Sequence, residues 1–159
     1  MKKIKLTQNK YALVDNKDYV SLSRHKWYAD RSPRNNSFYA VRQRPKSETG
    51  TCRIRMHTEI MNPPIGLEID HIDGNGLNNQ RSNLRICSGP ENRRNRGLTK
   101  NSTSGFKGVN WHKLSRKWIA RIQVNGNRIT LGRFVSKEEA YKKYCVACIK
   151  YHGKFAKIK

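Results

Sequence analysis

An aspartate next to a histidine, Asp70-His71, lies in a stretch (residues 67–97) that also holds spaced asparagines and several arginines. A carboxylate and a neutral oxygen ligand suit Mg²⁺ or Mn²⁺, hard cations that keep several waters and accept a phosphate oxygen. A histidine beside such an ion can act as a general base near neutral pH. Arginines can bind phosphates. Together these residue types predict hydrolysis of a phosphodiester.

The order of these residues along the chain is compatible with one site. Asp70 and His71 stand where a short strand is expected to end, so their side chains should point to opposite sides. Asn92 follows His71 by 21 residues, which is far enough to return on a helix and complete a metal site. Asn83 lies between them and is suited to bonding backbone groups of the loop. Taken singly, an Asp-His pair also forms surface salt bridges or caps, and Asp73 is typical of a turn.

Three pieces of sequence carry a resemblance to a known family: Ile69-Asp70-His71-Ile72-Asp73-Gly74-Asn75, Asn79-Gln80-Arg81-Ser82-Asn83-Leu84-Arg85 and Glu91-Asn92. They resemble the HNH motif of phage and intron-encoded homing endonucleases. His71 precedes Asn83 by 12 residues and Asn83 precedes Asn92 by 9, which fits that family closely. The resemblance implies two antiparallel strands and a helix around one divalent metal ion, Mg²⁺ or Mn²⁺.

The resemblance also implies catalytic roles for individual residues. Asp70 and Asn92 would be the metal ligands, His71 the base that activates water, and Asn83 the brace of the loop. The last letter of the motif name is often a histidine, and Asn92 is a variant common in the phage branch. His57 matches a recurrent family position, and we expect a structural or supporting role for it.

Residues 1–97 are expected to form a small antiparallel sheet that leads into this ββα-metal nuclease core. Short runs with alternating apolar residues predict strands, and a short helix is possible over Leu22–Trp27. Those runs are Ile4–Thr7, Tyr11–Val14, Phe38–Val41 and Cys52–Met56. Pro63-Pro64 stops any helix that begins near His57. A strand over Leu67–Ile69 and a helix opened by Ser88 or Pro90 complete the segment, and Trp27 and Tyr28 are expected to be core aromatics.

Residues 98–105 are polar and are interpreted as a linker, and residues 106–159 predict a three-stranded antiparallel sheet packed on one helix. The strands are expected at Lys107–His112, Lys117–Val124 and Asn127–Phe134. Asn125-Gly126 is a strong two-residue hairpin turn. Ser136-Lys137-Glu138-Glu139 is a capping box, so a helix should run from there to about His152-Gly153. The fold class expected for the whole chain is α+β.

The C-terminal segment resembles a second family, the plant ethylene-response-factor (APETALA) DNA-binding domain. The matching pieces are Ser104–Val109, Lys117–Ile122, Leu131–Phe134, Glu139-Ala140 and His152-Gly153. That resemblance implies a sheet laid in the major groove, with DNA-facing residues Asn110, His112, Arg121, Gln123, Arg128 and Thr130. The alternative is that these side chains are the ordinary solvent face of a sheet. Plant domains carry an arginine where this chain has Asn110, so their sequence preference does not transfer.

The charge balance favours a polyanionic partner. The 159 residues hold 34 Lys and Arg against 11 Asp and Glu, a formal net charge of +23. Nucleic acid is the usual partner of such a chain, because phosphate contacts release counterions. A cluster of cations, Arg93, Arg94, Arg96 and Lys100, could run along a groove, and the alternative is a solvated charge run. We expect double-stranded DNA as the partner, no small-molecule substrate and a monomer.

The chain has no apolar run near the ~20 residues of a membrane span and no apolar signal core at its start. We therefore expect no membrane partner and a cytoplasmic location, in the host cell if the protein is phage-encoded. Cys145 and Cys148 form a Cys-x-x-Cys, but no second pair completes a tetrahedral zinc site, so they are interpreted as small helix residues. The sequence thus predicts a metal-dependent, site-specific DNA endonuclease of the homing type. The rivals are a DNA-binding regulator that retains an inactive HNH scaffold and a zinc-stabilised nucleic-acid module.

Overall fold

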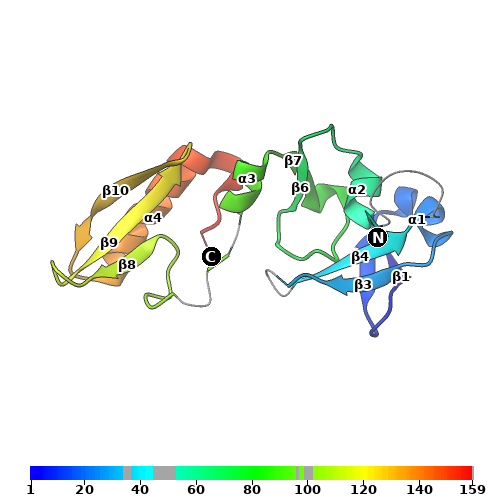
Figure 1. Cartoon of the computed structure of the whole chain (residues 1–159), viewed down its shortest axis with the longest axis horizontal. Coiled ribbons are helices and arrows are strands. Elements are labelled where there is room, and N and C mark those ends of the chain that lie inside the picture. The colour runs from blue at the N-terminus through cyan, green and yellow to red at the C-terminus, as the bar shows by residue number, and fades with distance from the viewer. Residues whose placement is uncertain (34–36, 45–52, 96, 99–101, 159) are drawn as a thin grey trace. The chain divides into compact units, whose positions relative to one another are not determined.

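A computed structural model of the protein describes residues 1–33, 37–44, 53–95, 97–98 and 102–158. Two compact units make up the chain, Met1–Ser88 and Gly89–Lys159 (Figure 1), each with its own hydrophobic core. The described residues form small antiparallel sheets and four α-helices, so the mixed α and β composition expected from the sequence is confirmed. No helix in these ranges is long and apolar enough to cross a bilayer.

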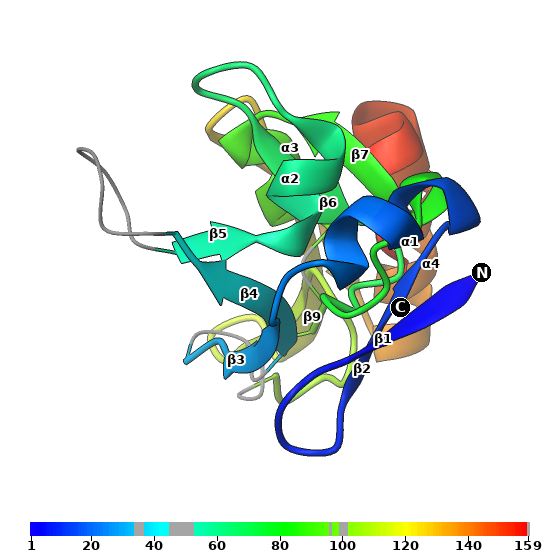
Figure 2. The ribbon, with the colours of Figure 1, turned by 90° about the vertical axis from the view of Figure 1, so that its right-hand side faces the viewer.

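The first unit begins with two separate sheets where a single one was expected (Figure 2). Their strands are β1 (Lys2–Lys5) and β2 (Tyr11–Val14) in one, and β3 (Tyr28–Arg31), β4 (Phe38–Gln43) and β5 (Arg53–Arg55) in the other. Strands β1 and β2 pair as a hairpin, and the turn between them contains Gln8 and Asn9, both at positive φ. The second sheet has the order β3-β4-β5, with all neighbours antiparallel.

The helix between the two sheets lies earlier than the sequence predicted. It is α1 (Asn16–Ser23), so the expectation of a helix over Leu22–Trp27 is wrong. Leu22 and Trp27 instead pack in the core, and the Trp27 indole Nε1 donates to the Leu22 carbonyl at 2.8 Å. The chain leaves α1 at Ser23 and enters β3 at Tyr28. The expectation that Trp27 is a core aromatic is confirmed, because its side chain is buried.

The part of the first unit that carries Asp70 and His71 is a hairpin with a long loop. Its strands, β6 (Glu68–His71) and β7 (Leu84–Cys87), pair antiparallel, and the 3-10 helix η1 (Arg81–Asn83) precedes β7. Helix α2 (Met56–Met61) comes before the hairpin and ends at Asn62, which takes the left-handed conformation ahead of Pro63-Pro64. The loop is bonded to β2, because the Leu13 N–H donates to the Leu77 carbonyl and the Leu13 carbonyl accepts from Asn79 N–H, both at 2.8 Å.

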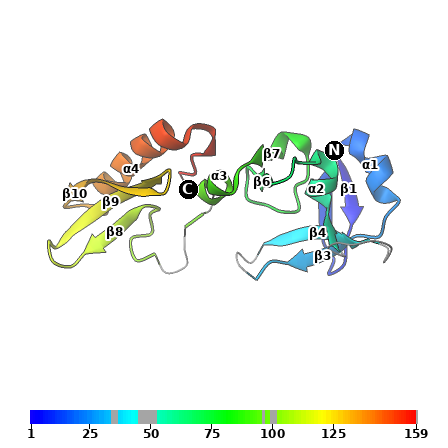
Figure 3. The same ribbon diagram turned by 45° about the horizontal axis from the view of Figure 1, so that its top comes forward.

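The second unit holds the expected three strands and long helix (Figure 3). Its elements are α3 (Gly89–Arg94), β8 (Val109–His112), β9 (Lys117–Val124), β10 (Asn127–Phe134), α4 (Lys137–His152) and the 3-10 helix η2 (Gly153–Phe155). Asn125 and Gly126 have φ values of 49° and 84°, as a tight hairpin turn requires. The Ser136 side chain caps α4 by accepting from the Glu139 N–H at 3.1 Å. These local sequence signals are confirmed.

Helix α3 belongs to the second unit and is attached there by a lysine. The Lys107 Nζ donates to the Arg94 carbonyl at the C-terminal end of α3, with a distance of 2.6 Å. Ser104 is buried, and its hydroxyl donates to the Val109 carbonyl at 2.8 Å. The end of the expected linker is therefore packed within the second unit, and the domain limits drawn from the sequence stay a prediction.

Candidate active site

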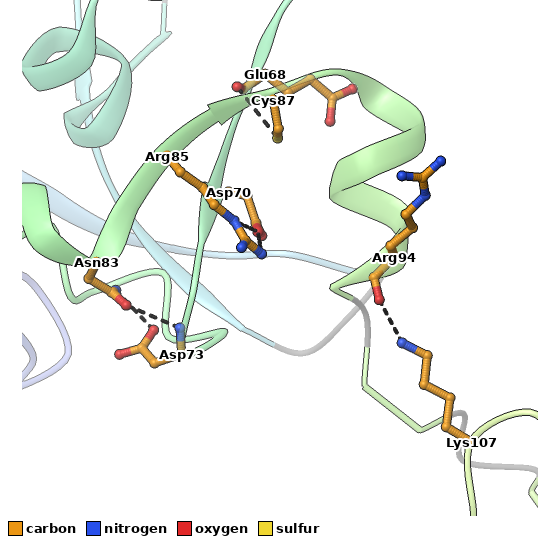
Figure 4. A network of polar contacts seen from close by, with 8 residues as sticks. All are labelled: Glu68, Asp70, Asp73, Asn83, Arg85, Cys87, Arg94 and Lys107. Carbon is orange, nitrogen blue, oxygen red and sulfur yellow. Dashed lines mark hydrogen bonds and ion pairs between the residues drawn. The ribbon is translucent and has the colours of Figure 1, made fainter. Parts of the chain in front are cut away.

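Asp70 and His71 occupy the end of β6 and point to opposite sides of the hairpin, as consecutive strand residues do. Asp70 lies directly opposite Arg85 in the β6–β7 register. Its Oδ2 atom accepts hydrogen bonds from Arg85 Nε at 2.8 Å and Nη2 at 2.5 Å (Figure 4). The side chains are only 6% and 14% exposed, so this is a buried, charge-assisted pair.

His71 is packed in a cluster of rings on the other side. Its ring centroid lies 4.9 Å from that of His57 and 5.9 Å from that of Tyr39, both edge-on. The His71 Nε2 atom lies 3.3 Å from Oδ1 of the buried Asn79. Burial lowers the pKa of His71 below its ordinary value, although the Asn79 bond and the carboxylates of Asp73 and Asp70 act in the opposite direction. A neutral imidazole, the form that can accept a proton, is therefore favoured near pH 7.

His57, on α2, is a second buried imidazole. Burial, together with the neighbouring His71 and the Arg55 cation, lowers its pKa to about 3. Its Nδ1 atom has no hydrogen-bond partner among the described residues. A group with so low a pKa stays neutral through the physiological range. The His57 ring packs against that of His71, and its structural or supporting role stays a prediction.

Asn83 and Asp73 tie the ends of the loop together. The Asn83 Oδ1 accepts from the Asp73 N–H at 3.1 Å, and its Nδ2 donates to the Asp73 carboxylate at 2.9 Å and to the Asn78 carbonyl at 2.8 Å. Burial alone would raise the pKa of Asp73, but hydrogen bonds from Asn75, Asn78 and Asn83 lower it below the usual value. Asp73 is therefore ionised and shapes the loop.

Asp70 can take part in binding a hard divalent cation. Its carboxylate already compensates one positive charge, the Arg85 guanidinium. Carboxylate and amide oxygens are the ligands that Mg²⁺ and Mn²⁺ prefer. The described residues contain no cluster of three or more His, Cys, Asp and Glu side chains arranged around a cation. The metal-ligand role of Asp70 therefore stays a prediction.

Of the other residues predicted near this site, three lie on α3 and two lie outside the described residues. Asn92, Arg93 and Arg94 lie on α3 in the second unit, so the metal-ligand role of Asn92 stays a prediction. Arg94 Nη2 also contacts Asn125 Oδ1 at 3.4 Å. Arg96 and Lys100 lie outside the described residues.

The six residues predicted to face DNA share one face of the β8–β9–β10 sheet. Directly opposed residues of an antiparallel pair lie on the same side, and alternate residues of a strand do too. The register pairs Arg121 with Thr130, Gln123 with Arg128, and His112 with Lys117. Helix α4 packs against the other face, where Ala120 and Ile122 belong to the core. The pattern of alternation also places Asn110, Lys117 and Arg133 on the face that α4 leaves open.

Two side chains on this face, those of His112 and Gln123, make hydrogen bonds within the second unit. The His112 Nδ1 lies 2.8 Å from the Ser115 hydroxyl and accepts from the Ser115 N–H, while Gln123 Nε2 donates to the Gly126 carbonyl at 3.3 Å. A shallow hollow of about 380 Å³ lies on this face. It is lined by Asn110, Arg121, Ile122, Gln123 and Arg128.

Sequence reasoning gave no role to several residues that define the site. Arg85 and Asn79 were recognised only as parts of the motif, and Tyr39 only as part of a strand. The partner of Asp70 follows from the strand register, and the contact between Asn79 and His71 follows from the path of the loop. Lys117 and Arg133 could have been found by the strand alternation that identified Arg121.

Comparison with known proteins links this region to nucleases. Residues 59–94 match the protein family described as HNH endonuclease. The chain is 42% identical over 72 residues to Protein 3.8 of Escherichia phage T7, covering 44% of this chain and 60% of that protein. It is 28% identical over 151 residues to a protein of Acanthamoeba polyphaga mimivirus named "Uncharacterized HNH endonuclease L560", covering 92% and 73% of the two chains. No solved structure matches the chain. The segment from α2 to α3 is therefore similar to an HNH endonuclease domain.

Proposed function

We propose that this protein is a metal-dependent, site-specific DNA endonuclease of the homing type. The observation that carries the proposal is a buried Asp70 beside a buried, neutral His71 at the end of β6, in a segment similar to HNH endonucleases. A carboxylate for a cation and a proton acceptor for water are the two groups that phosphodiester hydrolysis needs most. Double-stranded DNA is the proposed substrate, and the proposed acting form is a monomer.

In the proposed reaction His71 accepts the proton of a water molecule that attacks the phosphorus in line with the departing 3′ oxygen. Its low pKa keeps the ring unprotonated and ready to accept. Asp70 and Asn92 would hold a Mg²⁺ or Mn²⁺ ion, which supplies charge neutralisation for the phosphate and the departing oxygen when bound. Asn83 holds the loop that connects β6 to β7, so that the end of β6 keeps its position.

The open face of the second unit is the proposed DNA-recognition surface. Support comes from its side chains, because Arg121, Arg128, Lys117 and Arg133 place four cations on one face of a sheet. Arginine can pair a guanine edge or a phosphate, and Gln123 can read adenine. The APETALA-like mode of docking rests on the sequence resemblance, since the family match ends at residue 94.

A cleavage assay tests the proposed function. Supercoiled plasmid is incubated with wild type, His71→Ala, Asn92→Ala and Asp70→Asn in the presence of Mg²⁺ or Mn²⁺. Loss of the general base should reduce the single-turnover rate by about 10²- to 10⁴-fold. The exposed histidine of the same unit provides the matched control, and His25→Ala should cut like wild type. Chelation of divalent ions should stop cleavage, and their return should restore it.

Three results would each reject a part of this proposal. A wild-type protein that binds DNA yet cuts neither plasmid nor host genomic DNA with any divalent ion would be a DNA-binding regulator with an inactive HNH scaffold. Full activity of His71→Ala and Asn92→Ala would show that another site performs the reaction. Stoichiometric zinc in the purified protein would favour a zinc-stabilised module that uses the cysteines.

A further inference from the structure

Asn79 is the polar side chain that contacts the ring of His71. It is fully buried, and its Oδ1 atom lies 3.3 Å from His71 Nε2. An amide oxygen can only accept a hydrogen bond, so the ring nitrogen that faces it must carry the proton. The other nitrogen, Nδ1, then holds the lone pair. The Asn79 contact thereby selects the tautomer of His71.

The position of Asn79 is set by the N-terminal hairpin. Its backbone N–H donates to the Leu13 carbonyl of β2 at 2.8 Å, and Leu13 also binds the backbone of Leu77. The next residues are held by the same region: Gln80 Nε2 reaches Asp15 at 3.5 Å, and the Arg81 N–H donates to Asp15 at 2.9 Å. The hairpin lies outside residues 59–94, the part of the chain that matches the HNH family.

The side chain of Asn79 does not make the bonds expected of a purely structural asparagine. Its Nδ2 has no hydrogen-bond partner among the described residues, although the residue has no exposed surface. A buried donor left without a partner lowers stability, and an apolar residue of similar shape would avoid that cost. The placement of an amide here is therefore better explained by its contact with His71 than by stability.

We infer that Asn79 is a positioning residue for His71, and that β2 holds it in place through Leu13. Asn79 keeps the Nε2-protonated tautomer and orients Nδ1 as the atom that accepts the proton of water. The inference rests on the proposed nuclease function for its kinetic consequence, but the tautomer is a property of the protein alone. It gives the N-terminal hairpin a part in catalysis that a segment outside the HNH match would not otherwise have.

Nitrogen-15 NMR of the full-length protein, without DNA or metal, tests the tautomer directly. The His71 signals are assigned by their loss in His71→Gln. Wild type should show the neutral, Nε2-protonated form, and Asn79→Leu should lose the preference for it. A wild-type ring protonated at Nδ1 would overturn the inference, and this measurement needs no variant of Asn79 to fold.

Single-turnover cleavage of supercoiled plasmid with Mg²⁺ tests the consequence. Asn79→Leu should lower the rate constant at saturating protein by roughly 10- to 100-fold and leave the half-saturating concentration unchanged, because orientation of the base is lost and DNA binding is not. The exposed asparagine at the start of α1 is the matched control, and Asn16→Leu should cut like wild type. A folded Asn79→Leu with the wild-type rate would reject the positioning role. A wild type that never cuts would reject the nuclease proposal and leave the NMR result valid.

Discussion

At the scale of single residues, Asp70 and Arg85 form a buried, charge-assisted pair in the candidate site. Both side chains are almost completely removed from water, and two guanidinium nitrogens bind one carboxylate oxygen. A buried charge that loses its partner is far more costly than an exposed one. The stability of the β6–β7 hairpin therefore depends on the charge of Asp70, the proposed metal ligand.

Replacing Arg85 should destabilise the first unit because the buried Asp70 carboxylate would lose the guanidinium that binds it. We expect Arg85→Met to lower the free energy of unfolding by about 3–5 kcal/mol, the usual cost of breaking a buried pair from one side. Urea denaturation followed by circular dichroism measures this change. The control is Arg53→Met, because Arg53 and Asp30 are 3.8 Å apart and largely exposed. That variant should lose no more than about 1 kcal/mol, and equal losses in both would contradict the argument.

At the scale of elements, the loop between β6 and β7 packs tightly against β4. A Cβ atom on Gly76 would lie 2.5 Å from the Phe38 carbonyl oxygen and 2.6 Å from the Tyr39 ring. Because Tyr39 packs against both histidines, a shift of its ring would be transmitted to His71. The glycine thus permits the close approach that completes the ring cluster.

Gly76→Ala should therefore weaken both the fold and the site. Overpacking of this kind costs about 1–3 kcal/mol, measured as a loss in the free energy of unfolding. Gly97→Ala is the control, since nothing lies within 4 Å of a Cβ atom at that position. The site effect would appear as changed chemical shifts of the His71 ring in Gly76→Ala. Unchanged stability and unchanged His71 shifts would mean that the loop can move away from β4 without consequence.

The elements that sequence reasoning predicted correctly are those with local signals. Asn125-Gly126 specifies a hairpin turn by itself, and Ser136 with Glu139 specifies the start of α4. Strand β3 (Tyr28–Arg31) was missed because it is stabilised by pairing with β4, a contact between residues distant in sequence. The helix expected over Leu22–Trp27 was displaced to α1 because tertiary packing of Leu22 and Trp27 overrides local propensity.

The candidate site also contains residues that local sequence signals indicate and residues that only tertiary contacts bring in. The motif spacing grouped Asp70, His71 and Asn83, and their catalytic roles stay a prediction. The Arg85 contact depends on the β6–β7 register, and the Asn79 contact depends on bonds between the loop and β2. Neither register nor loop path has a local sequence signal, since both are fixed by the packed tertiary structure.

The C-terminal end of α4 carries a pH-dependent contribution to stability. His152 is buried, its Nε2 lies 3.0 Å from the Gln123 carbonyl, and its Nδ1 lies 3.6 Å from Cys148 Sγ. Burial lowers the pKa of His152 below its ordinary 6.5, and the cations of Arg94 and Lys107 act in the same direction. The unfolded chain therefore binds more protons than the folded chain once the pH falls below about 6.5.

The second unit should consequently lose stability as pH falls below 6.5, down to the lowered pKa of His152, and should show no such dependence above it. Hydrogen exchange of the β9 amides across this pH range, corrected for intrinsic exchange, measures the second unit separately from the first. His152→Gln should remove the dependence, and His112→Gln should keep it. A slope that persists in His152→Gln would assign the effect to another group.

At the scale of the whole molecule, the formal charge of +23 means that almost any surface could attract DNA without specificity. Removing a charge from one face of the second unit or from the other distinguishes non-specific attraction of DNA from binding at a defined surface. Arg121 and Arg128 lie on the open face of the sheet, whereas Lys142 is exposed on α4, which covers the opposite face. Each substitution to alanine removes one positive charge, so the three variants have the same net charge.

Salt dependence distinguishes the two forms of attraction. Each phosphate contact contributes about −0.9 to the slope of log K against log of salt concentration, so a lost contact makes the slope less steep by about one. Binding of a labelled duplex, followed by fluorescence anisotropy from about 50 to 200 mM KCl, should show this change in Arg121→Ala and Arg128→Ala but not in Lys142→Ala. Equal slopes in all three variants would mean that net charge alone drives binding and that the open face is an ordinary solvent face. A weaker affinity with an unchanged slope in Arg121→Ala would instead point to a base-edge contact, because such a bond releases no phosphate counterion.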